Sequence, residues 1–288
     1  MFVKLIYLAV IFITSLAACI YPVVSSFSSR SLYVLRHFGT GVIISTAILH
    51  LLEPANDALT EEILPEGWQN YPWAFALCLV GLFLTVLGDI FSQRHLYKKG
   101  ISHSHGQALT IETPSKLDSE IVPDISIATQ ISGLLVLEIG IVLHSLFIGL
   151  SLGATEKGGA LALAIVFHQT FEGLGLGARL SSIEWPQSKA WVPKLLAILY
   201  AVTTPVGILI GIALSEQYDE DSPTALIVTG ICDSLSSGIL LYTGLVELLG
   251  NELVNAHDLP TAPLKDVLVA YGSITAGCYA MACLAIWI

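Results

Sequence analysis

The chain has 288 residues, of which 54% are hydrophobic and only 12% charged, and its mean hydropathy is +0.76. Soluble globular domains carry about twice that charged fraction, so the composition argues against a soluble protein and predicts an integral membrane protein. The net charge of -11 gives no reason to expect a nucleic-acid partner. The apolar runs are long and do not alternate with polar residues, which favours membrane-spanning helices over barrel strands.

Eight apolar segments are long enough to cross a membrane as helices. In chain order they cover residues 3–24, 32–52, 73–91, 125–153, 159–180, 192–214, 224–249 and 267–288. The first segment could instead be a signal peptide, because Ser15–Cys19 resembles a cleavage region. Its apolar run continues to Val24, which favours a retained helix. We therefore expect an all-α polytopic membrane protein.

A single membrane domain is expected, divided into spans one to three (1–91), a loop (92–124) and spans four to eight (125–288). The loop is the longest polar stretch and cannot bury enough apolar surface to fold alone, so we expect it to be flexible. It contains His103 and His105, whose side chains could capture metal weakly. A solvated turn is the simpler interpretation of this short histidine pair.

The distribution of positive charge predicts the orientation of the chain. An even number of spans puts both chain ends on one side of the membrane. One set of loops and span ends holds ten of the twelve basic residues: Arg30, Arg36, Arg94, Lys98, Lys99, Lys116, Arg179, Lys189, Lys194 and Lys265. The opposite set holds only Lys4 and Lys157. The positive-inside rule makes the first set cytoplasmic and places both termini outside the cell or in a lumen.

Acidic residues gather in the loops expected on the outer side. They are Asp57, Glu61, Glu62, Glu66, Glu156, Glu216, Asp219, Glu220 and Asp221. Such a surface would concentrate cations at the outer mouth. Solvation alone also explains acidic loops, so cation attraction is one of two interpretations.

Two apolar segments carry the residues that point to metal chemistry. His168 and Glu172 are four residues apart in segment 159–180, so a helix places both on one face. His144 lies in segment 125–153. Ionisable groups at bilayer depth normally face a partner, a cavity or an ion. Two imidazoles and a carboxylate suit zinc or ferrous iron, so we predict an intramembrane metal site.

Each of these segments also contains two small residues four positions apart. The pairs are Gly149 with Gly153 and Gly173 with Gly177. Because such pairs let helices approach closely, we expect them to pack the two segments against each other. In segment 192–214, Thr204 precedes Pro205, which frees a backbone carbonyl. A ligand role and a simple packing kink are equally open there.

Further ionisable residues lie within or near the ends of other spans. They are His50, Glu53, Asp89, Glu138, Asp233 and Glu247. Each could lie on an ion pathway or bond a neighbouring helix. His50 and Glu53 are one helical turn apart at the outer end of span two, where they could form an entrance relay or be merely interfacial. Asp89 and Glu247 lie near span ends, where water could solvate them.

Several motifs together resemble the ZIP family of zinc and iron transporters, especially its fungal and plant branch. The matching stretches are Phe38–Ile44, Ala47–Leu52, Leu137–Gly153, His168–Gly173 (His-Gln-Thr-Phe-Glu-Gly), Thr204–Gly207 and Gly238–Tyr242. The resemblance covers almost the whole chain, and its motifs in spans four and five are highly specific. It implies a ZIP-like bundle of eight helices, with a metal site between spans four, five and six.

The resemblance also implies a function and a set of ligands. It implies import of divalent metal, zinc above all and iron as the alternative, into the cytoplasm. His144, His168 and Glu172 match the primary ligand positions, and Ser145, Gln169 and Thr204 match positions around a second metal. Some members carry carboxylates where this chain has Ile148 and Thr204, so we expect a single ion. Spans one, four, five and six would move against the other four, often within a homodimer.

Two other functions remain from the residues themselves. An intramembrane zinc hydrolase would also use histidines and a carboxylate, but the usual His-Glu-x-x-His motif is absent, since Gln169 follows His168. A membrane metal sensor would need a folded soluble domain to relay its signal, and none is predicted. We expect no cofactor besides the transported Zn²⁺ or Fe²⁺, the lipid bilayer as surroundings, and the plasma membrane as location, with the vacuolar membrane as alternative.

Overall fold

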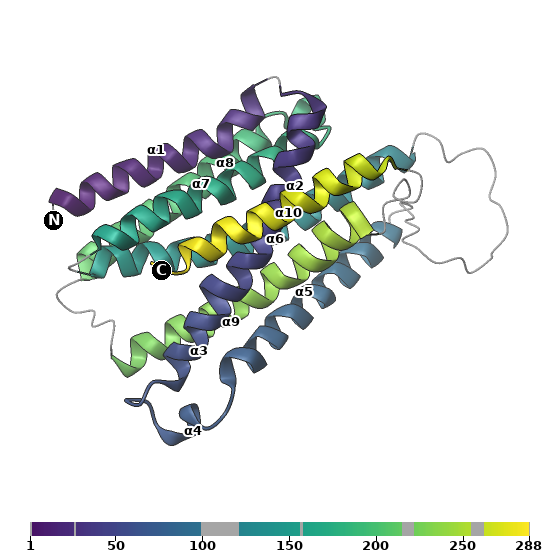
Figure 1. Ribbon diagram of the computed structural model, residues 1–288. Coiled ribbons are helices and arrows are strands. Elements are labelled where there is room, and N and C mark those ends of the chain that lie inside the picture. Colours follow the sequence, from purple (N-terminus) through teal and green to yellow (C-terminus); the bar gives the residue numbers. More distant parts are fainter. Residues whose placement is uncertain are drawn as a thin grey trace.

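The computed structural model describes residues 2–25, 27–98, 121–155, 158–214, 222–254 and 262–287. This part of the chain is helical and contains no strand. Eight helical runs within it are long and apolar enough to span a membrane. They lie side by side in one bundle (Figure 1), which confirms the predicted all-α, eight-span architecture.

The helices follow one another with short connections. The first half of the chain comprises α1 (Phe2–Val24), α2 (Ser29–Ser45), the π-helix η1 (Thr46–Leu52), α3 (Glu53–Thr60), α4 (Glu66–Gln69) and α5 (Trp73–Lys98). The second half comprises α6 (Ile121–Ala154), α7 (Gly159–Ser182), the 3₁₀ turn η2 (Gln187–Lys189), α8 (Val192–Leu214), α9 (Pro223–Tyr242), the π-helix η3 (Thr243–Val254) and α10 (Leu264–Leu284). The bounds of α8 are those predicted for span six.

Span two is longer than the sequence suggested. We expected it to end at Leu52, but the helical run continues through η1 and α3 to Thr60. Pro54 cannot donate a backbone hydrogen bond and disrupts a regular α-helix. In η1 the Glu53 N–H bonds the Ile48 carbonyl five residues back, and this wider turn accommodates the proline. Asp57, expected in an outer loop, consequently lies in α3.

The predicted loop between spans three and four begins and ends as helix. α5 continues past Phe91 to Lys98, because the polar residues that follow the apolar run are still compatible with a helix. α6 already starts at Ile121. His103 and His105 lie outside the described residues, so weak metal capture by this pair stays a prediction.

Different helix termini lie at the two ends of the bundle. The start of α1 and the end of α10 lie at the same end, which we call the Phe2 end (Figure 1). α5 stops and α6 starts at the opposite end, which we call the Lys98 end. α6 therefore runs from the Lys98 end to the Phe2 end, whereas α1 and α7 run the other way.

The spans pack as two groups. In the first, which we call the α6–α7 group, α6 packs along α8, and α1 packs along both α7 and α8. In the second, the α2–α9 group, α2 packs along α10, and α5 packs along α9. Both groups meet at the centre of the bundle through α2 against α7 and α6 against α9.

Candidate metal site

Three buried side chains from two helices converge in the middle of the bundle. His144 lies on α6, while His168 and Glu172 lie on α7, and none is more than 2% exposed. The His168 Nε2 atom lies 3.3 Å from the His144 Nε2 atom and 3.3 Å from the Glu172 Oε1 atom. One ligand atom from each residue lies within 4.8 Å of the others. Ligand atoms around a tetrahedral zinc ion are about 3.3 Å apart, so this spacing suits such an ion.

The sequence spacing explains the relative position of His168 and Glu172. His168 and Glu172 share a face of α7 because they are four residues apart, as predicted. Both carboxylate oxygens of Glu172 are buried without a hydrogen-bond partner, and so is the Nδ1 atom of each histidine. A buried carboxylate is costly when nothing compensates its charge. A divalent cation bound by the three residues would compensate it.

The glycine pairs position this site differently from the prediction. We expected them to pack α6 against α7, and this was wrong. A Cβ atom at Gly149 would overlap the Thr204 carbonyl oxygen of α8, and one at Gly177 would overlap the Cys19 carbonyl oxygen of α1. A small-residue pair shows that some helix comes close but does not identify which one. The two ligand helices are therefore each fixed by a different neighbour, α6 by α8 and α7 by α1.

The three residues predicted around a second metal form a polar cluster beside the first site. The Gln169 amide donates to Thr204 Oγ1, and it also donates to Ser145 Oγ at 3.4 Å. The Tyr200 hydroxyl donates to the Gln169 carbonyl oxygen. None of these groups carries a formal negative charge, and Ile148 packs against an apolar cluster. The cluster thus lacks a charge that would compensate a second divalent cation.

His50 lies deeper than the entrance position suggested by its sequence. It is buried in η1, and its ring centroid is 5.1 Å from that of His168. Its Nε2 atom bonds the Met281 carbonyl oxygen of α10 at 3.0 Å, so this nitrogen carries the proton and Nδ1 keeps a lone pair. Thr46, one turn earlier, faces Glu172 and was not singled out from the sequence. Its spacing of four residues from His50 could have indicated it.

Apart from Glu138 on α6, the other predicted pathway residues lie on α3, α5, α9 and η3. Glu53 is exposed at the start of α3. Asp89 accepts a hydrogen bond of 2.9 Å from the Tyr242 hydroxyl, which links α5 to α9. Asp233 is buried on α9, and Glu247 is half-buried on η3. None of them joins the His144, His168 and Glu172 cluster in the part of the chain that the structure describes.

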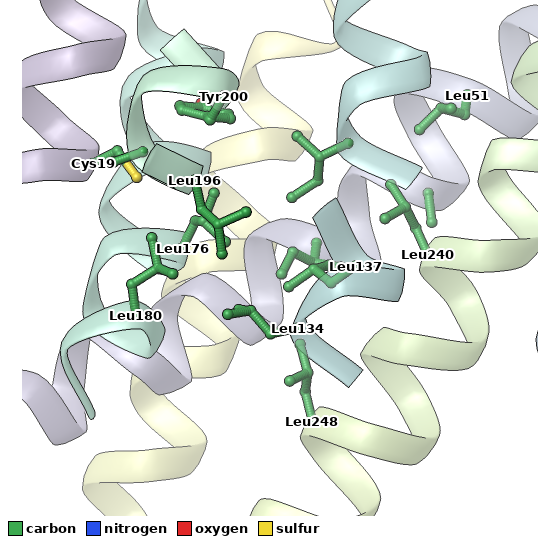
Figure 2. Packing of buried hydrophobic residues seen from close by; sticks show 14 residues of the cluster. Cys19, Leu51, Leu134, Leu137, Leu176, Leu180, Leu196, Tyr200, Leu240 and Leu248 are labelled. Carbon is green, nitrogen blue, oxygen red and sulfur yellow. The ribbon is translucent and has the colours of Figure 1, made fainter. Parts of the chain in front are cut away.

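Apolar side chains close the site towards both ends of the bundle. Towards the Phe2 end, Leu152, Ile165 and Ile208 belong to one buried cluster. Towards the Lys98 end lies what we call the leucine layer, shown in Figure 2: Leu134, Leu137, Leu176, Leu180 and Leu196. Leu176 follows Glu172 by one turn of α7, which places the layer directly next to the ligands. The site is therefore enclosed between two apolar barriers.

Known proteins are similar in sequence to this chain. The family model for the ZIP zinc transporter matches residues 2–285. Zinc-regulated transporter 1 of Saccharomyces cerevisiae is 37% identical over an alignment covering 85% of this chain and 77% of the yeast protein. Zinc transporter 3 of Arabidopsis thaliana is 32% identical, with 88% of this chain and 74% of the plant protein covered.

Fe(2+) transport protein 2 of Arabidopsis thaliana is 30% identical to this chain, and the alignment covers 99% of this chain and 87% of the plant protein. The residues that the family model matches contain all eight candidate spans. The family match extends over nearly the entire sequence, and the sequence resemblance pointed to the same family. The chain therefore belongs to the ZIP zinc transporter family.

Proposed function

We propose that the protein carries Zn²⁺ across its membrane into the cytoplasm through His144, His168 and Glu172, with Fe²⁺ as a second substrate. The observation that supports this most is the enclosed cluster of two imidazoles and one carboxylate, whose ligand atoms lie within 4.8 Å of one another. Relatives are named as zinc transporters, and one is named as an Fe(2+) transport protein. The ligand set suits both ions.

Family membership makes the protein a transporter, so the intramembrane hydrolase considered from the sequence is excluded. The chemistry of the site agrees with transport. Three protein ligands leave at least one coordination position for water, whereas a structural zinc site is closed by four protein ligands. An ion that must leave as well as bind needs such an open site.

Charge and packing support the proposed direction and motion of transport. Of the nine basic residues that the structure describes, eight lie on the side of the Lys98 end, which the positive-inside rule makes cytoplasmic. All three ligands lie in the α6–α7 group. Movement of this group past the α2–α9 group would carry a bound ion from one apolar barrier to the other. We place the protein in the plasma membrane, and assembly as a homodimer stays a prediction.

The first test removes the charge of the site while keeping its shape. Glu172→Gln leaves two neutral imidazoles and an amide, so the double charge of the ion is uncompensated in a low-dielectric setting. Removing one partner of a buried charge interaction costs about 3–5 kcal/mol, so initial uptake of external zinc should fall by more than about 100-fold. Uptake is measured in intact cells with surface amounts determined in parallel.

The control makes the same substitution outside the spans. Glu184 is exposed in the connection after α7, and Glu184→Gln should take up zinc like the parent. Normal uptake of zinc and iron by Glu172→Gln would show that the metal route does not pass through this site.

A further inference from the structure

Glu138 is a buried carboxylate that the proposed site does not use. It is 3% exposed, and neither of its oxygens has a hydrogen-bond partner. It lies on α6 six residues before His144, about 9 Å along the helix. Because α6 starts at the Lys98 end, Glu138 is displaced from the ligands towards the expected cytoplasmic side.

The helix register places Glu138 below the polar cluster of Gln169. Glu138 precedes Ser145 by seven residues, which is two helical turns, so both lie on one face of α6. Tyr200 of α8 lies one turn from Thr204 in the same direction and bonds the Gln169 carbonyl oxygen. Tyr200 also belongs to the buried cluster that contains Leu137, the residue that precedes Glu138. Polar groups thus continue from the site towards the Lys98 end.

A second metal-binding group lies near this carboxylate. The Cys19 side chain of α1 is 0% exposed, and it belongs to the same buried cluster as Leu137, the residue that precedes Glu138 on α6. Figure 2 shows Cys19 beside Leu176 and Leu196, in the same cluster as Tyr200. Carboxylate oxygen and cysteine sulfur are both zinc ligands. Two ligands contributed by different helices would hold an ion less firmly than the three at the central site.

Apolar residues of the same helix flank this unpartnered carboxylate. Leu134 and Leu137, its neighbours on α6, belong to the leucine layer. An unpaired carboxylate in an apolar layer is costly, and a well-packed hydrophobic residue would stabilise the bundle better. An ion that leaves the central site towards the Lys98 end must cross this same layer. A carboxylate and a thiol part-way would compensate and coordinate the ion during that crossing.

We propose that Glu138 and Cys19 form a transient binding station for the transported cation on the Lys98 side of the His144, His168 and Glu172 site. The proposal rests on the proposed function, because a station is useful only if the ion passes through the bundle. Conduction through several weak sites allows an ion to bind and still to leave. The station acts after the central site, so it controls the release rate rather than the affinity of initial binding.

The experiment separates binding from release. Glu138→Gln keeps the shape of the side chain and removes its charge. Maximal zinc uptake should fall by about tenfold, whereas equilibrium zinc binding to the purified protein should stay within about twofold of the parent. Glu138→Asp restores the charge and should recover a third or more of the parent rate. A merely structural glutamate would tolerate glutamine at least as well as aspartate, because glutamine preserves its volume.

Two cysteine variants test the role of the Cys19 thiol. Cys19→Ser should lower maximal uptake by about threefold. Cys232→Ser, which changes a partly buried thiol on α9 away from the ligands, should leave it unchanged. Parent-like uptake by Glu138→Gln overturns the proposal. Loss of zinc binding in that variant also overturns it, since the residue would then belong to the central site.

If Glu138→Gln does not reach the membrane, the comparison of Cys19→Ser with Cys232→Ser tests the proposal instead. Equal maximal uptake by these two variants overturns the proposal. Failure of the proposed function gives a different result, because Glu172→Gln would then transport normally. Loss of transport in Glu172→Gln together with normal transport in Glu138→Gln rejects the station alone.

Discussion

The two groups of helices are built alike inside but meet each other differently. Within the α6–α7 group, a Cβ atom at Gly207 would overlap the Leu146 carbonyl oxygen. Within the α2–α9 group, a Cβ atom at Gly238 would overlap the Cys78 carbonyl oxygen. Between the groups, Gly140 faces mainly the side chain of Leu240. Backbone-to-backbone seams resist shifts that flexible side chains can follow, so each group is expected to move as one body.

Most of the functional residues lie in one of the two groups. The three ligands and the Glu138 and Cys19 pair all belong to the α6–α7 group, and His50 approaches from the other group. A displacement between the groups would keep the ligands together and separate them from His50. One close crossing joins the groups at Gly39 and Gly175, next to hydrogen bonds made by Arg179.

The largest effect is expected from breaking a seam inside one group. A Cβ atom at Gly211 of α8 would overlap the Leu150 carbonyl oxygen of α6, so Gly211→Val should separate the two helices. Overpacking of this kind costs about 3 kcal/mol. The melting temperature of the purified protein, and its amount in the membrane, should both fall clearly.

Gly272→Val provides the control for this seam. Gly272 is also a helical glycine, but a Cβ atom there would meet nothing within 4 Å, because it lines an apolar groove between α2, α7 and α10. Both variants change helix propensity alike, so their difference measures packing. Equal melting temperatures would contradict the description of the α6–α8 seam as a rigid contact.

A smaller effect is expected where the α2–α9 group contributes to the metal site. His50→Ala removes a ring that contacts His168 and a hydrogen bond to Met281. Supporting residues around a metal commonly change affinity by tenfold or more, so the apparent zinc affinity should fall about tenfold. Uptake measured over a range of zinc concentrations tests this, and the loss should be smaller than that of Glu172→Gln.

His37→Ala is the matched control, because His37 is also a buried histidine of span two. Its Nδ1 atom bonds the Tyr33 carbonyl oxygen at 2.8 Å, one turn earlier in its own helix. The apparent zinc affinity should therefore stay near that of the parent. Equal losses in both variants would mean that His50 acts through helix stability rather than through the site.

These contrasts show what the sequence could predict. Apolar run length located the eight spans, and the spacing of four residues located His168 and Glu172 on one face. Both are properties of a single helix. The partners of the glycine seams depend on which helices become neighbours, and local patterns do not contain that information. The depth of His50 depends on the π-turn in η1, which continues the helix past the expected end of the span.

The smallest effect should come from loosening the contact between the groups. The Arg179 Nη2 atom of α7 donates to Thr40 Oγ1 of α2 at 2.7 Å and to the Arg36 carbonyl oxygen at 3.1 Å. Thr40→Val keeps the shape of the residue and removes one acceptor. Hydrogen bonds between membrane helices are worth about 1 kcal/mol, so relative movement of the groups should become about fivefold more populated.

The Cys19 thiol reports this movement, because it is buried in a cluster that also contains Ile43 and Leu240 of the α2–α9 group. In a protein whose other four cysteines are replaced by alanine, a membrane-permeant maleimide should label Cys19 about fivefold faster in Thr40→Val than in the parent. Thr40→Ser keeps the acceptor oxygen and should label at the parent rate. Faster labelling in both variants would point to a local packing defect, and unchanged labelling in both would show that the Arg179 contact does not restrain the two groups. Because the remaining Arg36 contact persists in Thr40→Val, the protein should stay folded and keep its zinc affinity, which confines the effect to the balance between the two groups.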